Sequence, residues 1–226
     1  ENVAVGIDAL TDCTTGEGNT CVGRVAGANI TTGTYYTAIG HNALFSATTG
    51  NSNTGIGRNA GFDLTTGSNN LLLGQNSGRS DAPSGAVTTA NNIVCLGNNN
   101  IANLFCKVST IQTSDIRDKT DVTDFKHGLS WVEKLRPITY RWDMRSNYVD
   151  GKPDGSKKET RINLGFIAQE VLEIEKEHGF ASEKDMMLLV NENESGNFGM
   201  KYDRVVPILV NAIKELSAKV TALETA

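Results

Sequence analysis

The fold of the first half of the chain is decided by a short stretch, NTGIGRNAG at residues 53–61. Its parts recur at intervals of 17 residues on both sides. One glycine series is Gly6, Gly23, Gly40, Gly57 and Gly74, each directly after Val, Ile or Leu, and the other is Gly16, Gly33, Gly50 and Gly67, each closing a Thr-Thr-Gly. A fixed period sustained over several copies is the signature of a repeat architecture.

The repeat predicts stacked β structure. Its short runs of Thr, Val and Ile are strand-sized, and its glycines and asparagines supply turns that need positive φ. One apolar residue and small neighbours per copy make a thin core, which buries too little to offset the entropy of ordering one chain. We therefore expect a homotrimeric β-solenoid, in which chains stacked side by side bury more; a single-chain β-helix is the alternative.

The period breaks after Gly74. Residues 78–90 carry Ser, Pro and Gly and are predicted to form a loop. Residues 92–97, NIVCLG, look like a displaced sixth copy, and the apolar run at 101–111 is predicted to form closing strands. Since residue 1 already lies inside the repeat, we expect the chain to be part of a longer protein.

Composition divides the chain after residue 113. Residues 1–113 hold 16 of the 23 glycines but only 10 of the 47 Asp, Glu, Lys and Arg residues. Both tryptophans lie in the second half. We therefore predict a repeat domain over residues 1–113 and a separate α+β domain over residues 114–226.

Composition also excludes several functional classes. The net charge of −5 comes without a basic stripe, which argues against a nucleic-acid partner. No run of about 18 apolar residues is present, so no membrane partner is expected. Cys13, Cys21, Cys95 and Cys106 lack the CxxC spacing, and the three histidines are not spaced as ligands, so neither a metal nor a cofactor is expected and the thiols are predicted to be free.

The second half has the patterns of a mixed domain. The expected elements, in chain order, are a short helix at 129–135 ended by Pro137, a hairpin of strands 138–142 and 161–167, a helix at 169–177, and a second hairpin of strands 188–191 and 198–202 around Ser195-Gly196.

The tail, residues 203–226, predicts a long helix. Its apolar residues are separated by 3, 4, 3, 4 and 3 positions: Val206, Leu209, Ile213, Leu216, Val220 and Leu223. This spacing is the a/d seam of a coiled coil, here expected to be trimeric. The alternative is an amphipathic helix packed on its own domain.

Four ordered motifs in 114–226 carry a family resemblance. They are SDIRDK at 114–119, Leu135-Arg136-Pro137-x-x-Tyr140-x-Trp142, GFIAQEV at 165–171, and the helix at 207–213. Together they resemble the intramolecular chaperone domain of endosialidases, which ends many phage tail spikes, tail fibres and neck appendages and also occurs in the myelin regulatory factor. The DNA-binding and membrane segments of the myelin factor context are not seen here. The repeat resembles head modules of trimeric adhesins and phage tail fibres.

The resemblance implies a trimeric, self-cleaving chaperone with a Ser–Lys dyad, carried here onto Ser114 and Lys119. Ser114 would attack the carbonyl of Thr113, its own preceding residue. A serine hydroxyl is a weak nucleophile that needs an adjacent base, and lysine is a base only when neutral. Its reference pKa of about 10.4 must therefore fall toward roughly 7–8.

The neighbours of the dyad bear on this requirement. Arg117 is expected to lower the pKa of Lys119, because a nearby cation disfavours a second one, whereas Asp118 paired with that lysine would raise it. Oriented donors must also stabilise the developing oxyanion. Gln169, or a backbone N–H near Gly165, is the expected donor, and Asp115 and Glu170 are further supporting candidates.

The expected function follows from the resemblance. The second half drives trimerisation and folding of a phage tail fibre or spike and then releases itself by cutting between Thr113 and Ser114, acting once and in cis. Folding and cleavage would take place in the host cytoplasm, and the mature fibre would belong to the virion. The alternative is a trimerisation domain that never cuts, on a fibre tip that binds a host receptor or surface glycan. No further partner is expected.

Overall fold

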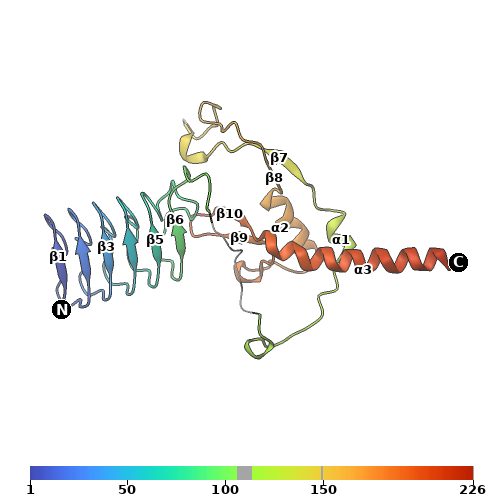
Figure 1. The fold of residues 1–226 in the computed structure, drawn as a ribbon, viewed down its shortest axis with the longest axis horizontal. Helices are drawn as coiled ribbons and strands as arrows, with labels where there is room; N and C mark the ends of the chain where they lie inside the picture. The colour runs from blue at the N-terminus through green and yellow to red at the C-terminus, as the bar shows by residue number, and fades with distance from the viewer. Residues whose placement is uncertain (106–113, 149, 226) are drawn as a thin grey trace. The chain divides into compact units, whose positions relative to one another are not determined.

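The computed structural model describes residues 1–105, 114–148 and 150–225 (Figure 1). The chain is mainly β, with an α+β part toward its C-terminus. It forms two compact units. The first contains residues 1–103 together with 143–158 and 193–197, and the second contains the rest of the described chain.

The repeat folds as a β-solenoid of parallel strands. The strands pair in chain order, each with the next, from β1 to β6. They are β1 Val3–Val5, β2 Thr20–Val22, β3 Thr37–Ile39, β4 Thr54–Ile56, β5 Leu71–Leu73 and β6 Val94–Leu96. Thr37 pairs with Thr54, one period of 17 residues away. Because β6 pairs with β5 across the 78–90 loop, the displaced sixth copy is confirmed.

The interior of the solenoid combines the small residues of the repeat, as expected, with larger residues that the repeat pattern did not single out. Ala26, Ala43 and Ala60, at the same position in successive copies, are fully buried. In β2 to β6 the middle residue of each strand is buried, as Cys21, Ala38 and Leu72 are, and Leu44 and Leu64 from the segments between strands complete the core. The apolar residue that ends each strand was expected to form the core, but it faces outward: Ile39 and Ile56 are 38 % and 40 % exposed. A three-residue strand puts its first and last side chains on the same face, here the outer one.

The glycine series marks where neighbouring copies touch. Gly40 has φ of +127°, and a Cβ on it would lie 2.7 Å from the carbonyl oxygen of Gly57 in the next copy. A larger residue would therefore be strained in its backbone and would also push two copies apart. Period and glycine position thus have the same physical cause.

Two predictions for the first half, the closing strands and the free thiols, can be checked only in part. Residues 101–105 form no strand, so the predicted closing strands are wrong there, and the remainder of that run lies outside the described residues. Cys13, Cys21 and Cys95 are free thiols, as predicted, while Cys106 lies outside the description. Burial, with a smaller contribution from Cys13, raises the pKa of Cys21 to about 11.

The elements of the second half confirm the predicted order. The hairpins β7–β8 and β9–β10 are both antiparallel, with strands shorter than expected. The helices and strands are α1 Leu129–Val132, β7 Ile138–Tyr140, β8 Asn163–Gly165, α2 Ala168–Glu177, β9 Val190–Glu192, β10 Phe198–Met200 and α3 Val205–Glu224, with 3-10 turns η1 Ile116–Asp118, η2 Arg145–Asn147, η3 Lys184–Met186 and η4 Tyr202–Arg204.

A buried carboxylate organises the core of the second unit. Trp131 and Leu189 are almost fully buried there, and so is the charged side chain of Glu175 on α2. The carboxylate of Glu175 accepts hydrogen bonds from three backbone N–H groups, those of Leu188, Leu189 and Val190, at 2.6–2.9 Å. These bonds compensate the burial of the charge and fix the start of β9 on α2.

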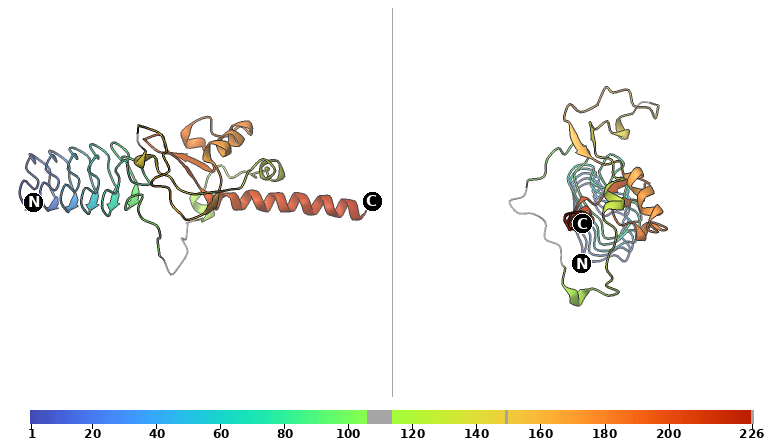
Figure 2. Two further views of the ribbon diagram at one scale, coloured as in Figure 1. Left: turned by 90° about the horizontal axis from the view of Figure 1, so that it is seen from above. Right: turned by 90° about the vertical axis from the view of Figure 1, so that its right-hand side faces the viewer.

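Helix α3, the long helix that ends at the C-terminus in Figures 1 and 2, has two apolar faces with different environments. Val205, Ile208 and Ala212 are buried in the second unit. The residues at seam positions are exposed, from 42 % at Leu209 to 80 % at Leu223. The helix is thus predicted correctly, and its seam is unoccupied by any part of the described chain. No helix in the described residues is long and apolar enough to cross a membrane.

Candidate functional site

The turn at residues 114–119 is built by a local capping arrangement. Asp115 is the N-cap of η1, and its Oδ1 accepts a hydrogen bond from the Arg117 backbone N–H at 2.9 Å. The Arg117 guanidinium also donates to both carboxylate oxygens, from Nε to Oδ1 at 3.0 Å and from Nη2 to Oδ2 at 2.6 Å. These hydrogen bonds lower the pKa of Asp115 from its usual value. Asp115 and Arg117 therefore stabilise a tight reversal of the chain.

The reversal brings Lys119 back onto Ser114. Lys119 Nζ lies 2.7 Å from Ser114 Oγ and 3.1 Å from the Ser114 carbonyl oxygen, and donates to both. Both side chains are exposed to solvent in the single chain. Nucleophile and base candidates within hydrogen-bond reach satisfy the first geometric requirement for an activated serine. Thr113, whose carbonyl would be attacked, lies outside the described residues.

The charged neighbours of Lys119 are arranged differently from the expectation. Arg117 is occupied by Asp115, so much of its positive charge is offset locally. Within the described chain, Asp118 forms no salt bridge with Lys119, whose ammonium group points to Ser114 instead. The unfavourable pairing considered from the sequence is therefore absent from this geometry.

The expected oxyanion donors and supporting residues either interact with groups other than the dyad or are exposed. Gly165 is buried in β8, and the next backbone N–H, that of Phe166, donates to the Tyr202 hydroxyl at 3.2 Å. Gln169 is exposed on the first turn of α2. Glu170 is ion-paired with Arg136, which joins the second and third sequence motifs. No hydrogen bond or ion pair in the described chain connects these groups to Ser114 or Lys119, so their assignment stays a prediction.

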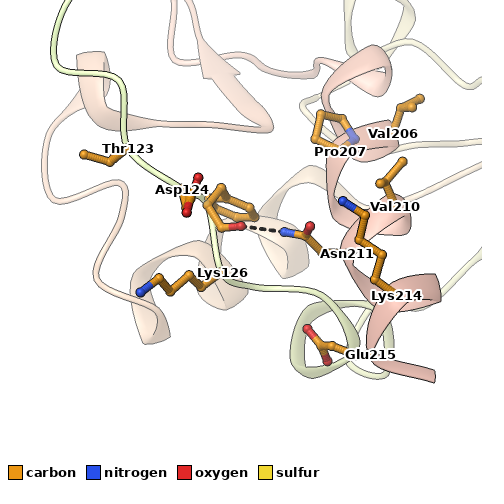
Figure 3. A pocket seen from close by; sticks show the side chains of 10 residues that line it. Thr123, Asp124, Lys126, Val206, Pro207, Val210, Asn211, Lys214 and Glu215 are labelled. Atoms are coloured by element: carbon orange, nitrogen blue, oxygen red, sulfur yellow. Dashed lines mark hydrogen bonds between the residues drawn. The ribbon is translucent and has the colours of Figure 1, made fainter. Parts of the chain in front are cut away.

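The sequence reasoning missed a clamp between α3 and the segment that follows the dyad (Figure 3). The Asn211 side-chain amide donates to the carbonyl oxygens of Phe125, at 2.5 Å, and His127, at 3.3 Å. Glu215 accepts from the Leu129 backbone N–H at 3.1 Å, at the start of α1. Asn211 and Glu215 are polar residues of the predicted helix that lie outside its apolar seam. This position was the only sign in the sequence that they make contacts of their own.

Beside this clamp, α3 and residues 123–126 line an open groove of about 730 Å³. Asp124, Lys126, Lys214 and Glu215 give it charges of both signs, and Val206 and Val210 give it apolar patches. Val206 also belongs to the exposed seam. Whatever packs on that seam therefore also borders the groove. The described residues contain no cluster of His, Cys, Asp and Glu that could hold a metal ion.

The match of this chain to a known family begins at the candidate serine. Residues 114–180 match the family model described as the chaperone of endosialidase, a family of self-cleaving peptidases. The match starts at Ser114 and includes the first three of the four motifs, whereas the helix at 207–213 lies beyond it. This similarity supports an intramolecular chaperone domain in this part of the chain, and a β-solenoid precedes it. Neither the curated proteins nor the solved structures contain a match.

Proposed function

We propose that this chain is part of a phage tail fibre or spike whose chaperone domain assembles a trimer and then cuts itself off between Thr113 and Ser114. The observation that carries the proposal is the coincidence of two independent features. The chaperone-family match begins at Ser114, and Lys119 Nζ lies 2.7 Å from the oxygen of that same serine. A solvated polar turn has no reason to coincide with a family boundary.

The chemistry of the cut requires the neutral form of Lys119. Its amine takes the proton of the Ser114 hydroxyl while Oγ attacks the Thr113 carbonyl carbon. The Thr113–Ser114 C–N bond then breaks, and the same proton passes to the α-amine of Ser114. Water hydrolyses the resulting ester, which leaves a Thr113 carboxylate and a downstream fragment beginning with Ser114.

The single chain supports the nucleophile and base but lacks two other requirements. The dyad is exposed, whereas a lysine base requires a desolvated setting, and no donor of the described chain is directed at the reaction centre. We infer that neighbouring copies provide both when the trimer forms. Cleavage would then occur only in correctly assembled chains.

Helix α3 connects the proposed assembly surface to the dyad. Its seam is exposed and has coiled-coil spacing, while Asn211 and Glu215 of the same helix bind the backbone of residues 125–129. That segment begins six residues after Lys119. A trimer built on the seam therefore positions the chain that leads directly to the dyad.

Mass spectrometry of freshly expressed protein tests the dyad. We expect the wild-type chain to yield a fragment beginning at Ser114, and Ser114→Ala and Lys119→Gln each to give a single intact chain. Ser130→Ala and Lys157→Gln are matched controls at exposed positions outside the dyad and should cleave normally. A fragment starting at Ser114 from either dyad variant would refute the assignment.

The seam is tested by Leu216→Glu, with Ala218→Glu as a control of equal charge change on the opposite side of α3. Leu216→Glu should be monomeric in analytical ultracentrifugation and remain intact, whereas Ala218→Glu should be trimeric and cleave. Complete cleavage of a monomer would show that assembly is not required. A wild-type trimer that never cleaves would instead establish the alternative function, a permanent trimerisation domain on a receptor-binding fibre.

A further inference from the structure

The charged side chains and the histidine of residues 18–62 all lie in one column of the solenoid. Arg24, His41 and Arg58 occupy the same position in three successive copies, each directly after a glycine of the first series. Their strands β2, β3 and β4 pair in parallel at this period, so the three residues lie one above another. Adjacent paired strands are 4.7–4.9 Å apart, which places the backbones of Arg24 and Arg58 about 10 Å apart.

The backbone under this column is held in register. Each of the three carbonyl oxygens accepts a hydrogen bond from an asparagine N–H in the next copy, at 2.9–3.1 Å: Asn42 to Arg24, Asn59 to His41, and Asn76 to Arg58. The asparagine side chains form a second ladder, with the amide of Asn42 donating to Asn59 and that of Asn59 to Asn76. The column is therefore preorganised, which reduces the ordering cost of binding a ligand.

The cations of the column lack a carboxylate partner. Residues 18–62 contain no Asp or Glu, and in the described chain neither Arg24 nor Arg58 forms a salt bridge. Arg24 Nη1 instead lies 3.5 Å from His41 Nε2. Arg79 provides the contrast, because it meets Asp63 at 3.5 Å. Stacked like charges repel, so the column costs stability unless an anion binds it.

In the proposed trimer, a second copy of this chain is a poor source of that anion. Parallel copies in register would bring residues 18–62 of one chain beside residues 18–62 of the next, and this stretch is free of carboxylates. Glu17 lies before the column. Asp63 belongs to the same copy as Arg58, but it is already paired with Arg79 of its own chain. The favoured partner is therefore an anion from outside the assembly.

We propose that this column binds a linear acidic polysaccharide that runs along the solenoid, with its carboxylate or sulfate groups on Arg24 and Arg58. The arginine fork matches both kinds of anion through paired N–H donors. Duplex DNA fits less well, since it carries a charge about every 1.7 Å and needs a broad basic surface. Residues 1–105 hold six acidic residues against three arginines. A sparsely charged sugar chain needs only the column.

Binding of fluorescent polymers to the full-length chain tests the proposal. The probes are dextran sulfate, polygalacturonate and uncharged dextran, and the first two distinguish sulfate from carboxylate recognition. The double variant Arg24→Gln/Arg58→Gln should bind the preferred acidic polymer at least about tenfold more weakly, whereas Lys152→Gln/Lys158→Gln, with the same loss of charge, should bind as the wild type does. Arg24→Lys/Arg58→Lys should bind more weakly than the wild type, because lysine lacks the fork, but more tightly than the Gln pair, because it keeps the charge. Added salt should weaken it.

Three outcomes would overturn the inference. They are no binding of either acidic polymer by the wild type, equal weakening in the two Gln double variants, and equally tight binding of duplex DNA that depends on the same arginines. Circular dichroism verifies that the variants keep their β structure, and the Lys pair measures the column in a chain that keeps its charge. The Ser114→Ala chain should bind like the wild type, so this result is independent of the proposed cleavage.

Discussion

Removing the charge of Glu175 should destabilise the chaperone domain more than its small volume change suggests. In Glu175→Gln the carbonyl oxygen can still accept the N–H groups of Leu189 and Val190, which lie 2.6 and 2.9 Å from Oε1. The new NH₂ group then faces the Leu188 N–H across 2.8 Å. Two donors would meet in the protein interior, and neither would have an acceptor.

The cost can be worked out from these contacts. Losing a hydrogen bond to a charged acceptor costs about 1.5–3 kcal/mol, and leaving a buried donor unsatisfied has a similar cost, partly counted in the first. Removal of a buried charge offsets some of this. The free energy of unfolding should fall by about 3 kcal/mol. With a urea dependence of about 2 kcal/mol per M, the unfolding midpoint should fall by about 1.5 M.

Tryptophan fluorescence in urea measures this in the Ser114→Ala background, where the chain stays uncut. Trp131 is fully buried, and the solenoid copies contain no tryptophan, so the signal reports the chaperone domain. Glu177→Gln is the matched control: Glu177 is exposed and pairs with Lys134 on the surface, an interaction with a typical contribution of about 0–1 kcal/mol. Protein concentration is held constant because assembly adds stability. If the urea midpoints of Glu175→Gln and Glu177→Gln differed by less than about 0.3 M, the reasoning would be refuted.

Three further changes have defined outcomes. Gly40→Ala should lower the melting temperature of the solenoid by circular dichroism, because its Cβ meets the carbonyl of Gly57; an unchanged melting temperature would contradict the close packing of copies. Cys21, with a pKa of about 11, should resist iodoacetamide at pH 8 until the solenoid unfolds, as followed by mass spectrometry, and rapid labelling of the native chain would contradict its burial. Hydrogen bonds from Arg117 lower the pKa of Asp115. The stability that Asp115 gives to the turn is therefore fully present above the ordinary aspartate pKa of about 3.9 and is lost as pH falls through the lowered pKa. An NMR titration of the Asp115 carboxyl with a pKa at or above about 3.9 would contradict the pairing with Arg117.

The solenoid was predictable from sequence because its cause is local and repeated. Gly40 is required by its own φ and by the copy above it, and the same requirement returns every 17 residues. The direction of Ile39 was not predictable in this way. A three-residue strand offers too little alternation, and the inside is decided by Leu44 and Leu64, whose contribution depends on how the corners fold.

The candidate site was likewise predictable from sequence where its contacts are local and not where they are long-range. Ser114 and Lys119 are five residues apart, and one capped turn brings them together, so local sequence was sufficient. The contacts of Asn211 with Phe125 and His127 span more than 80 residues and leave no periodic pattern. Glu175 did leave a signal, a charged residue four positions after Val171 on the apolar face of α2.

The repeat also explains why a removable domain would set the alignment of the chains. In the proposed trimer, the outward apolar residues of the solenoid, such as Ile39 and Ile56, would meet their counterparts in neighbouring chains. A slip by one copy replaces Ile39 with Ile56, which is chemically the same, so these contacts cannot specify the register. In the same proposal, the α3 seam occurs once in the chain, so it would specify one alignment before the solenoids pair. After the proposed cut that information would be gone, and a solenoid that separated would have no unique alignment to return to, which would make the assembled state persistent for kinetic reasons.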